Sequence, residues 1–172
     1  MVDLERARAA VTDAVGRLSA AGVPDEALAE FTPQRRKLGI TLSPRMKPTG
    51  RAWRLGVFLL DTGGTLYAAG HSTRAVEPGR SNYQSISGEE RRMHRAAAHR
   101  SYPEGTVVNF GSSVLELTEE GLAAASGPLF ISDGRLLVRW NPTADVTTAP
   151  EFEAYLRERV ELLLSPPAGS TE

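Results

Sequence analysis

The sequence predicts an α+β domain, in which a largely antiparallel sheet of five or six strands has flanking helices at both termini and one helix inserted between two hairpins. Two hairpin signals carry this prediction. Apolar runs flank the turn-forming residues 61–64, and Asp133 with Gly134 separates a second pair of apolar runs. Strands and helices do not alternate regularly along the chain, which favours α+β packing over a parallel α/β sheet.

Amphipathic helices are predicted near both ends of the chain. Apolar residues recur every three or four positions between residues 3 and 21, and charged residues lie off that stripe. A proline followed by two acids at residues 24–26 predicts a second short helix that stops before Pro33. Thr148 and Glu151 form a capping box that opens the final helix.

The remaining strands differ in their expected exposure. Residues 51–60 are apolar at both odd and even positions, so we expect a central strand that is covered on both faces. In the second hairpin, Arg135 and Arg139 alternate with apolar residues, which predicts one face in water. Residues 33–50 hold three prolines and two glycines and are expected to form an irregular connection.

Length and composition favour one globular domain spanning residues 1–172. Its expected parts are an N-terminal helical segment (1–32), the irregular connection (33–50), an α+β core (51–165) and a flexible tail (166–172). A hydrophobic fraction of 41% and a net charge of -1 are ordinary for a soluble protein. The first ten residues lack an apolar signal core and no long apolar run follows, so we expect a cytoplasmic protein that contacts no membrane.

The residues most able to carry chemistry gather in one window. All three histidines and six of the eighteen arginines lie between residues 71 and 100. Ser87 and Glu90 form a capping box for a helix over residues 88–100, which closes before Pro103. On a helical wheel, Met93 is at the centre of the buried side with Ala96 and Ala97, while Arg91 faces away.

Two histidines of this window are candidate catalytic bases. Glu90 and His94 are four residues apart, so the carboxylate could orient the imidazole as in a general base. The alternative is an ion pair on the helix surface. His71 is the second candidate base, with Arg74 as an anion clamp.

The loop that precedes the helix is rich in hydrogen-bonding side chains. It runs into a helix N-terminus, where free backbone amides favour an anion. We expect a ligand-binding surface formed by Arg74, Tyr83, Gln84 and Arg91. The alternative is a loop whose polar side chains satisfy its own backbone.

The sequence predicts no cofactor and no metal. It has no cysteine, which excludes disulfides, thiolate ligands and a cysteine nucleophile. His94 and His99 are five residues apart and cannot share a metal from one helix. The basic residues of the window have few aromatic neighbours, which argues against nucleic acid as a partner.

Several segments resemble a known group of proteins: WRLGVFLLDTGGTLYAAG, TRAVEPGR, YQSIS, EERR, AAAHR and GTVVNFG. They are similar to a family of small uncharacterised proteins from high-GC Gram-positive bacteria, and the bias toward arginine fits such an origin. Some members carry the label glutaminase. The residues needed for that activity are missing, since Gln34 and Pro44 stand three positions before the two lysines, where an S-x-x-K motif needs serine.

These observations favour a non-catalytic binding or interaction module whose partner is a protein or a small anionic ligand. The alternative is a hydrolase or lyase-type enzyme with a histidine general base and an arginine anion clamp. We also expect a homodimer, because the N-terminal apolar stripe needs either the sheet or a second copy to cover it. That stripe consists of Leu4, Val11, Val15 and Leu18.

Overall fold

The computed structural model describes residues 3–79, 86–123, 126–141 and 146–167. Its helices are α1 (Leu4–Ala20), α2 (Ile86–Ser101), α3 (Glu119–Ala123) and α4 (Phe152–Leu164), with a 3-10 turn at Val146–Thr148. Its strands are β1 (Glu26–Thr32), β2 (Arg35–Lys37), β3 (Ile40–Leu42), β4 (Arg45–Leu55), β5 (Phe58–Leu60), β6 (Leu66–Ala68), β7 (His71–Arg74), β8 (Val107–Phe110), β9 (Ser113–Val114), β10 (Leu129–Ser132) and β11 (Arg135–Val138). Within these residues, no helix has both the length and the apolar character that crossing a bilayer requires.

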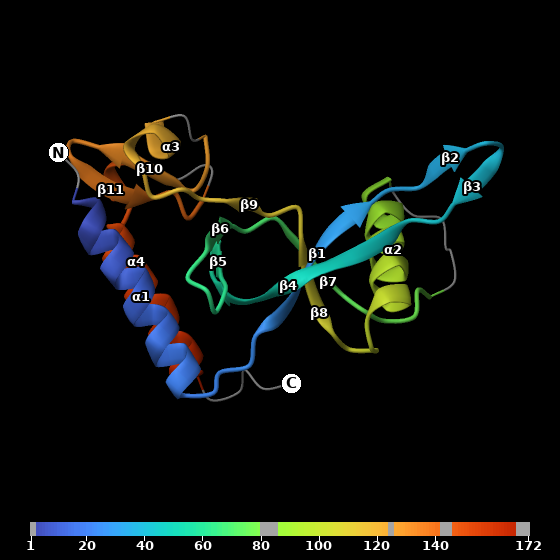
Figure 1. Cartoon of the computed structure of the whole chain (residues 1–172), viewed down its shortest axis with the longest axis horizontal. Helices are drawn as coiled ribbons and strands as arrows, with labels where there is room; N and C mark the ends of the chain where they lie inside the picture. The colour runs from blue at the N-terminus through green and yellow to red at the C-terminus, as the bar shows by residue number, and fades with distance from the viewer. Residues whose placement is uncertain (1–2, 80–85, 124–125, 142–145, 168–172) are drawn as a thin grey trace. The chain divides into compact units, whose positions relative to one another are not determined.

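The predicted α+β class is confirmed (Figure 1). The main sheet has seven strands in the order β7-β8-β1-β4-β5-β6-β9, rather than five or six. Every neighbouring pair in it is antiparallel except β1 and β8, which are parallel. Two separate hairpins, β10–β11 and β2–β3, complete the strands.

The contacts divide the chain into two compact units, where the sequence favoured one domain. Unit 1 comprises Met1–Asp25, Trp53–Ala69 and Ser113–Glu172, and unit 2 comprises Glu26–Ala52 and Gly70–Ser112. Strand β4 contributes to both, because it pairs with β1 in unit 2 and then with β5 in unit 1. Each unit has its own cluster of buried apolar side chains.

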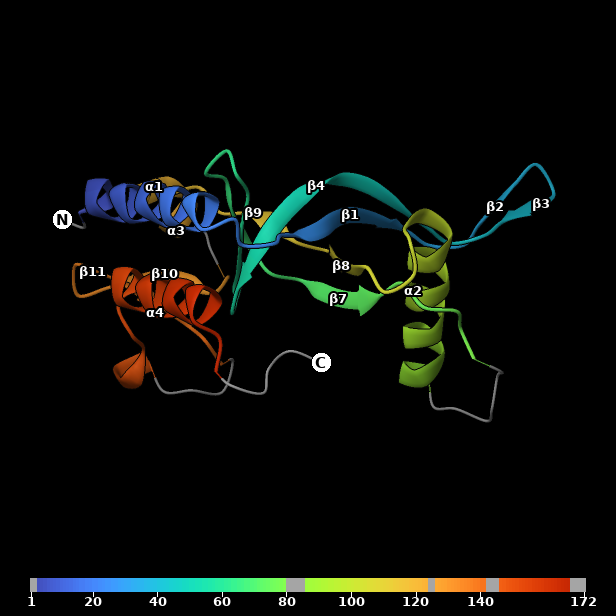
Figure 2. The ribbon, with the colours of Figure 1, turned by 90° about the horizontal axis from the view of Figure 1, so that it is seen from below.

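In unit 1, helices α1 and α4 lie side by side (Figures 1 and 2). Their buried faces consist of Ala7, Val11, Ala14 and Leu18 from α1 and of Phe152, Tyr155, Leu156 and Val160 from α4. Arg17 of α1 also forms an ion pair with Glu161 of α4. The N-terminal stripe is therefore covered by this chain. The homodimer stays a prediction, but the stripe no longer argues for it.

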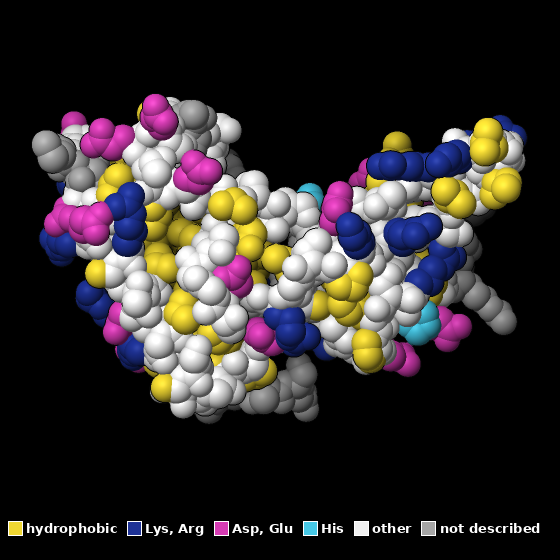
Figure 3. Space-filling view, in the orientation of Figure 1, with side chains coloured by type: hydrophobic (Ala, Val, Ile, Leu, Met, Phe, Trp, Pro, Cys, Tyr) yellow, Lys and Arg dark blue, Asp and Glu magenta, His cyan; other side chains and the backbone are white. Residues whose placement is uncertain are grey.

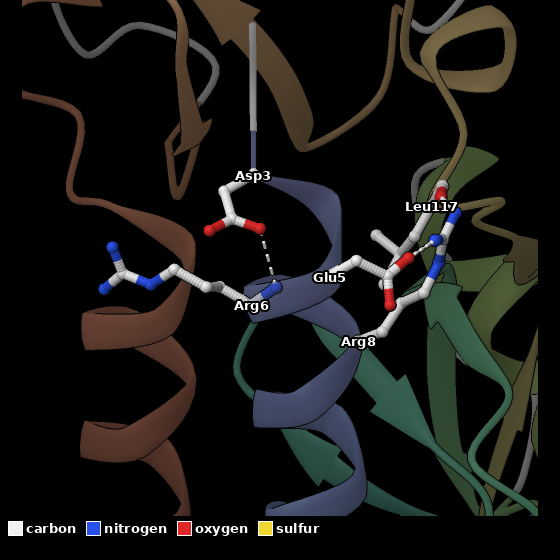
Figure 4. A network of polar contacts seen from close by, with 5 residues as sticks. All are labelled: Asp3, Glu5, Arg6, Arg8 and Leu117. Carbon is white, nitrogen blue, oxygen red and sulfur yellow. Dashed lines mark hydrogen bonds and ion pairs between the residues drawn. The ribbon is translucent and has the colours of Figure 1, made fainter.

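Polar contacts hold the first turn of α1 (Figure 4). Asp3 caps the helix, because its Oδ1 accepts a hydrogen bond from the backbone N–H of Arg6 at 3.2 Å. Arg8 forms an ion pair with Glu5 and donates to the carbonyl oxygen of Leu117 at 2.6 Å. These contacts attach the start of the helix to the segment before α3.

The short helix predicted after Pro24 is wrong, because residues 26–32 form strand β1. This strand is hydrogen-bonded on both edges, to β4 and to β8. Ala27, Leu28 and Ala29 are all buried, so side chains on both faces are covered. Pairing on both edges outweighs the helix propensity of alanine and glutamate, because such local preferences are small beside tertiary pairing and burial.

The irregular connection predicted for residues 33–50 is also wrong. It contains β2, β3 and most of β4. Pro48 is accommodated in β4 because, among the described strands, this part of β4 pairs with β1 alone, so the missing N–H breaks no second ladder. Proline content therefore misled the prediction where the strand had a free edge.

The strand predicted over residues 51–60 is interrupted by a tight turn. Gly56 has a φ of +67°, and Leu55 pairs directly with Phe58 across it. The hairpin predicted around residues 61–64 is confirmed as β5 and β6. Asp61 Oδ1 accepts hydrogen bonds from the backbone N–H groups of Gly63 and Thr65, which stabilise this turn.

The second hairpin is confirmed, with positive φ at both Asp133 and Gly134. We expected one face of its second strand to be exposed to solvent. This prediction is wrong at Leu137, which is buried and bridges to Glu151. The capping box at the final helix is wrong too, because α4 begins at Phe152 and Glu151 occupies the N-cap without a side-chain cap bond.

In unit 2, helix α2 begins at Ile86, so Ser87 lies in its first turn and not at the N-cap that the capping box required. Its fully buried residues are Ala97 and Ala98, whereas Met93 is only half-buried. The predicted wheel is therefore confirmed at Ala97 and wrong in its centre at Met93. The small residues pack against the sheet because they let the helix approach closely, and they form one cluster with Ala27, Ala29, Met46, Ala75, Val108 and Phe110.

Gly56→Ala is expected to destabilise unit 1 more than Gly64→Ala does. Both glycines have positive φ, but a Cβ at Gly56 would lie 2.1 Å from the hydroxyl of buried Tyr155, while a Cβ at Gly64 meets nothing within 4 Å. Gly64→Ala should cost about 1–2 kcal/mol from backbone strain alone. If urea unfolding showed equal losses of unfolding free energy for the two variants, the clash with Tyr155 would not contribute.

Ala97→Leu is expected to lower the free energy of unfolding by about 1–3 kcal/mol through overpacking beneath α2. Met93→Ala should cost less than the roughly 2–5 kcal/mol typical of a buried methionine, because Met93 is half-buried. Chemical denaturation of both variants checks the corrected orientation. If Met93→Ala lost more unfolding free energy than Ala97→Leu, Met93 would lie at the centre of the buried side of α2, as the sequence predicted.

Candidate functional site: a cationic pocket beside helix α2

The candidate site lies where α2 packs along β7, the edge strand of the sheet in unit 2. Antiparallel pairing places His71 opposite Phe110 and Thr73 opposite Val108. Directly opposed residues share a face, and Val108 and Phe110 belong to the apolar cluster that contains the buried alanines of α2. The register of β7 therefore directs His71 and Thr73 toward the helix.

A pocket of about 470 Å³ opens between these elements, and unit 2 supplies its whole lining. Its lining residues are His71, Ser72, Thr73, Arg74, Arg91, His94, Arg95, Val107 and Phe110. Among the described lining residues, three are arginines, two are histidines and none is an acid. Such a lining attracts negative charge and has an apolar wall.

His94 is a half-buried group in the lining of this pocket. Its ring lies 4.7 Å from the ring centres of both Phe31 and Phe110, and His71 lies 5.6 Å from Phe110. Burial lowers the pKa of His94, and the positive charge of His71 lowers it further, against a smaller opposing effect of Glu90. The neutral imidazole is therefore favoured at neutral pH.

Two of the three pocket arginines are held by backbone carbonyls. Arg91 donates from Nε to the carbonyl oxygen of Ser87 at 3.1 Å, and Arg74 donates to that of Gly105 at 3.3 Å. Among the described residues, neither these two nor Arg95 forms an ion pair with a carboxylate. Their charges remain uncompensated at the pocket, which suits a negatively charged ligand.

Four of the predicted site residues lie together in this pocket: His71, Arg74, Arg91 and His94. Glu90 does not join them. It is exposed, it forms no hydrogen bond with His94 in the described structure, and it acts on that ring only through its charge. The hydrogen bond by which Glu90 would orient His94 is therefore not formed in the described structure, and a catalytic role for either residue stays a prediction. Tyr83 and Gln84 lie outside the described residues.

Sequence reasoning missed Arg95 and the two phenylalanines. Arg91, His94 and Arg95 are spaced three and four residues apart, the spacing of one helix face, and this signal could have found Arg95. No local signal could have found Phe31 or Phe110, because β1 and β8 bring them to His94 from distant parts of the chain. Among the described residues, no three His, Asp or Glu side chains gather as a metal site would require.

No protein-family model, curated protein or solved structure matches the chain. The resemblance to small bacterial proteins of unknown role therefore stays a prediction.

The pKa of His94, measured by NMR titration of its ring protons, is expected to lie below the ordinary value of about 6.5. His71→Gln removes a nearby positive charge and should raise it. Because the folded-state pKa is the lower one, the contribution of His94 to stability is present above the unfolded-state pKa and is lost as pH falls through the folded-state pKa. An unchanged His94 pKa in His71→Gln would contradict the assigned proximity.

Proposed function

We propose that unit 2 is a binding module for a small anionic molecule, which it takes into the pocket between α2 and β7. The observation that carries this is the convergence of Arg74, Arg91 and Arg95 around one pocket without an acidic lining residue. Arginine recognises planar carboxylates and phosphates through paired N–H groups. A volume of about 470 Å³ suits a small metabolite and not a polymer.

The pocket also has an apolar wall, which narrows the chemistry of the ligand. Val107 and Phe110 line it together with the cationic groups. A molecule that carries one or two carboxylates or a phosphate on a short organic body would satisfy both parts of the lining. A bare inorganic ion would use only the arginines and should bind more weakly.

Proton uptake is expected to accompany binding. An anion next to His94 stabilises the charged imidazole and raises a pKa that is lowered in the free protein. Affinity should therefore increase as pH falls through the pKa of His94.

A second candidate is a hydrolase or lyase-type enzyme in which His94 is the general base and the arginines clamp an anionic substrate. One observation favours it: burial keeps His94 neutral, and a neutral imidazole can accept a proton. The enzyme candidate is weakened because Glu90 forms no hydrogen bond with His94 in the described structure and so does not orient its ring. The two candidates differ in His94→Gln, which should retain ligand binding in both but abolish turnover only in an enzyme.

Calorimetric titration with inorganic phosphate and with succinate tests the binding module. Arg91→Ala and Arg95→Ala should each weaken binding about tenfold or more, since a hydrogen bond to a charged group is worth roughly 1.5–3 kcal/mol. Arg92→Ala is the matched control, because Arg92 is on the same helix, pairs with Glu89 and does not line the pocket. Equal effects of the three substitutions, or no binding of either probe, would contradict the proposal.

A further inference from the structure

Strands β2 and β3 form a short hairpin of unit 2 that we call the β2–β3 arm (residues 35–42). Its two strands pair with each other and with no other described strand. Every residue of the arm is exposed. In two views at right angles, the arm extends beyond β1 and β4 (Figures 1 and 2). No described part of unit 2 therefore covers it.

Three exposed aliphatic side chains lie along the arm, from its turn to its base. Leu38 is 94% exposed, Ile40 65% and Leu42 38%. Leu38 also has a φ of +50° next to Gly39 at +80°, a turn that strongly prefers Asn-Gly. An exposed leucine in this conformation costs stability and gains no internal contact, so its reason lies outside the folding of the chain.

Positive charge surrounds these aliphatic side chains. The arm carries Arg35, Arg36 and Lys37, and Arg45 follows at the start of β4. Between residues 31 and 60 the chain has no Asp or Glu. Unit 2 holds twelve Lys and Arg against six Asp and Glu, whereas unit 1 holds eight against fifteen. Figure 3 shows Lys and Arg side chains next to hydrophobic ones at the β2–β3 end of unit 2.

We propose that the β2–β3 arm docks unit 2 onto the surface of an anionic lipid bilayer, with Leu38 entering the acyl boundary and the arm's cations at the lipid phosphates. The register supports this, because Arg35 opposes Leu42 and Lys37 opposes Ile40. Arg35 and Lys37 thus share one face of the arm with Ile40 and Leu42. Long basic side chains can reach the headgroups while the aliphatic ones are buried. Such docking is peripheral and needs no spanning helix, and it departs from the absence of membrane contact that the sequence led us to expect.

Nucleic acid is the competing polyanion, and the composition of the arm disfavours it. Residues 32–52 contain no aromatic side chain on which a base could stack. Exposed aliphatic side chains gain no burial against a charged phosphate backbone, whereas the acyl boundary of a bilayer buries them. The proposal is independent of the anion pocket, whose residues are outside the arm.

Flotation of the full chain with lipid vesicles tests this proposal. Vesicles of phosphatidylcholine with about one third phosphatidylglycerol should bind the chain at low salt, and vesicles of phosphatidylcholine alone should bind it far less. Leu38→Asn should weaken the binding about tenfold or more, as expected for losing one buried leucine. Replacing Arg35, Arg36 and Lys37 with glutamine should weaken it roughly a hundredfold.

Leu38→Asn also controls for folding, because Asn-Gly is the preferred sequence of this turn and should keep or raise the melting temperature. Leu162→Asn is the matched surface control, since Leu162 of α4 in unit 1 is exposed to the same extent as Leu42. Binding that is equal for both vesicle types, or unaffected by Leu38→Asn, overturns the proposal. Tighter binding to duplex DNA that is insensitive to Leu38→Asn assigns the arm to nucleic acid instead.

Discussion

Strand β1 is hydrogen-bonded along both edges, and the arrangement of unit 2 depends on that pairing. On one side it aligns antiparallel with β4, and on the other it runs parallel to β8. Since β8 in turn sets the register of β7, the pairing of β1 determines where His71 and Phe110 lie. A slip of one residue would turn both side chains to the opposite face of the sheet.

The helix that completes the pocket is held by small side chains. Ala97 and Ala98 are fully buried against the face that carries Val108 and Phe110. Because alanines allow close approach, His94, one turn earlier, reaches Phe31 and Phe110. The low pKa of His94 follows from this packing. The neighbouring arginines stay in water at the pocket edge, so the site combines a neutral enclosed base with exposed positive charge.

The division of charge between the units shows how a near-neutral total conceals a functional signal. A net charge of -1 indicates no partner, yet it is the sum of a positive unit 2 and a negative unit 1. Both proposed binding features, the pocket and the β2–β3 arm, belong to the positive unit. The boundaries that reveal this segregation are set by long-range contacts, and each unit is assembled from separate stretches of the chain.

The sequence by itself determined the features that depend on local chemistry. Asp133-Gly134 specified its hairpin, the apolar repeat specified α1, and the clustering of histidine and arginine located the window that supplies most of the pocket. Only the tertiary structure decided that residues 26–32 are a strand, that Glu90 forms no hydrogen bond with His94 in the described structure, and that Phe31 and Phe110 enclose that ring. The physical reason is that these outcomes depend on pairing and burial between distant segments, whose free energy exceeds the small local preferences that a sequence pattern reports.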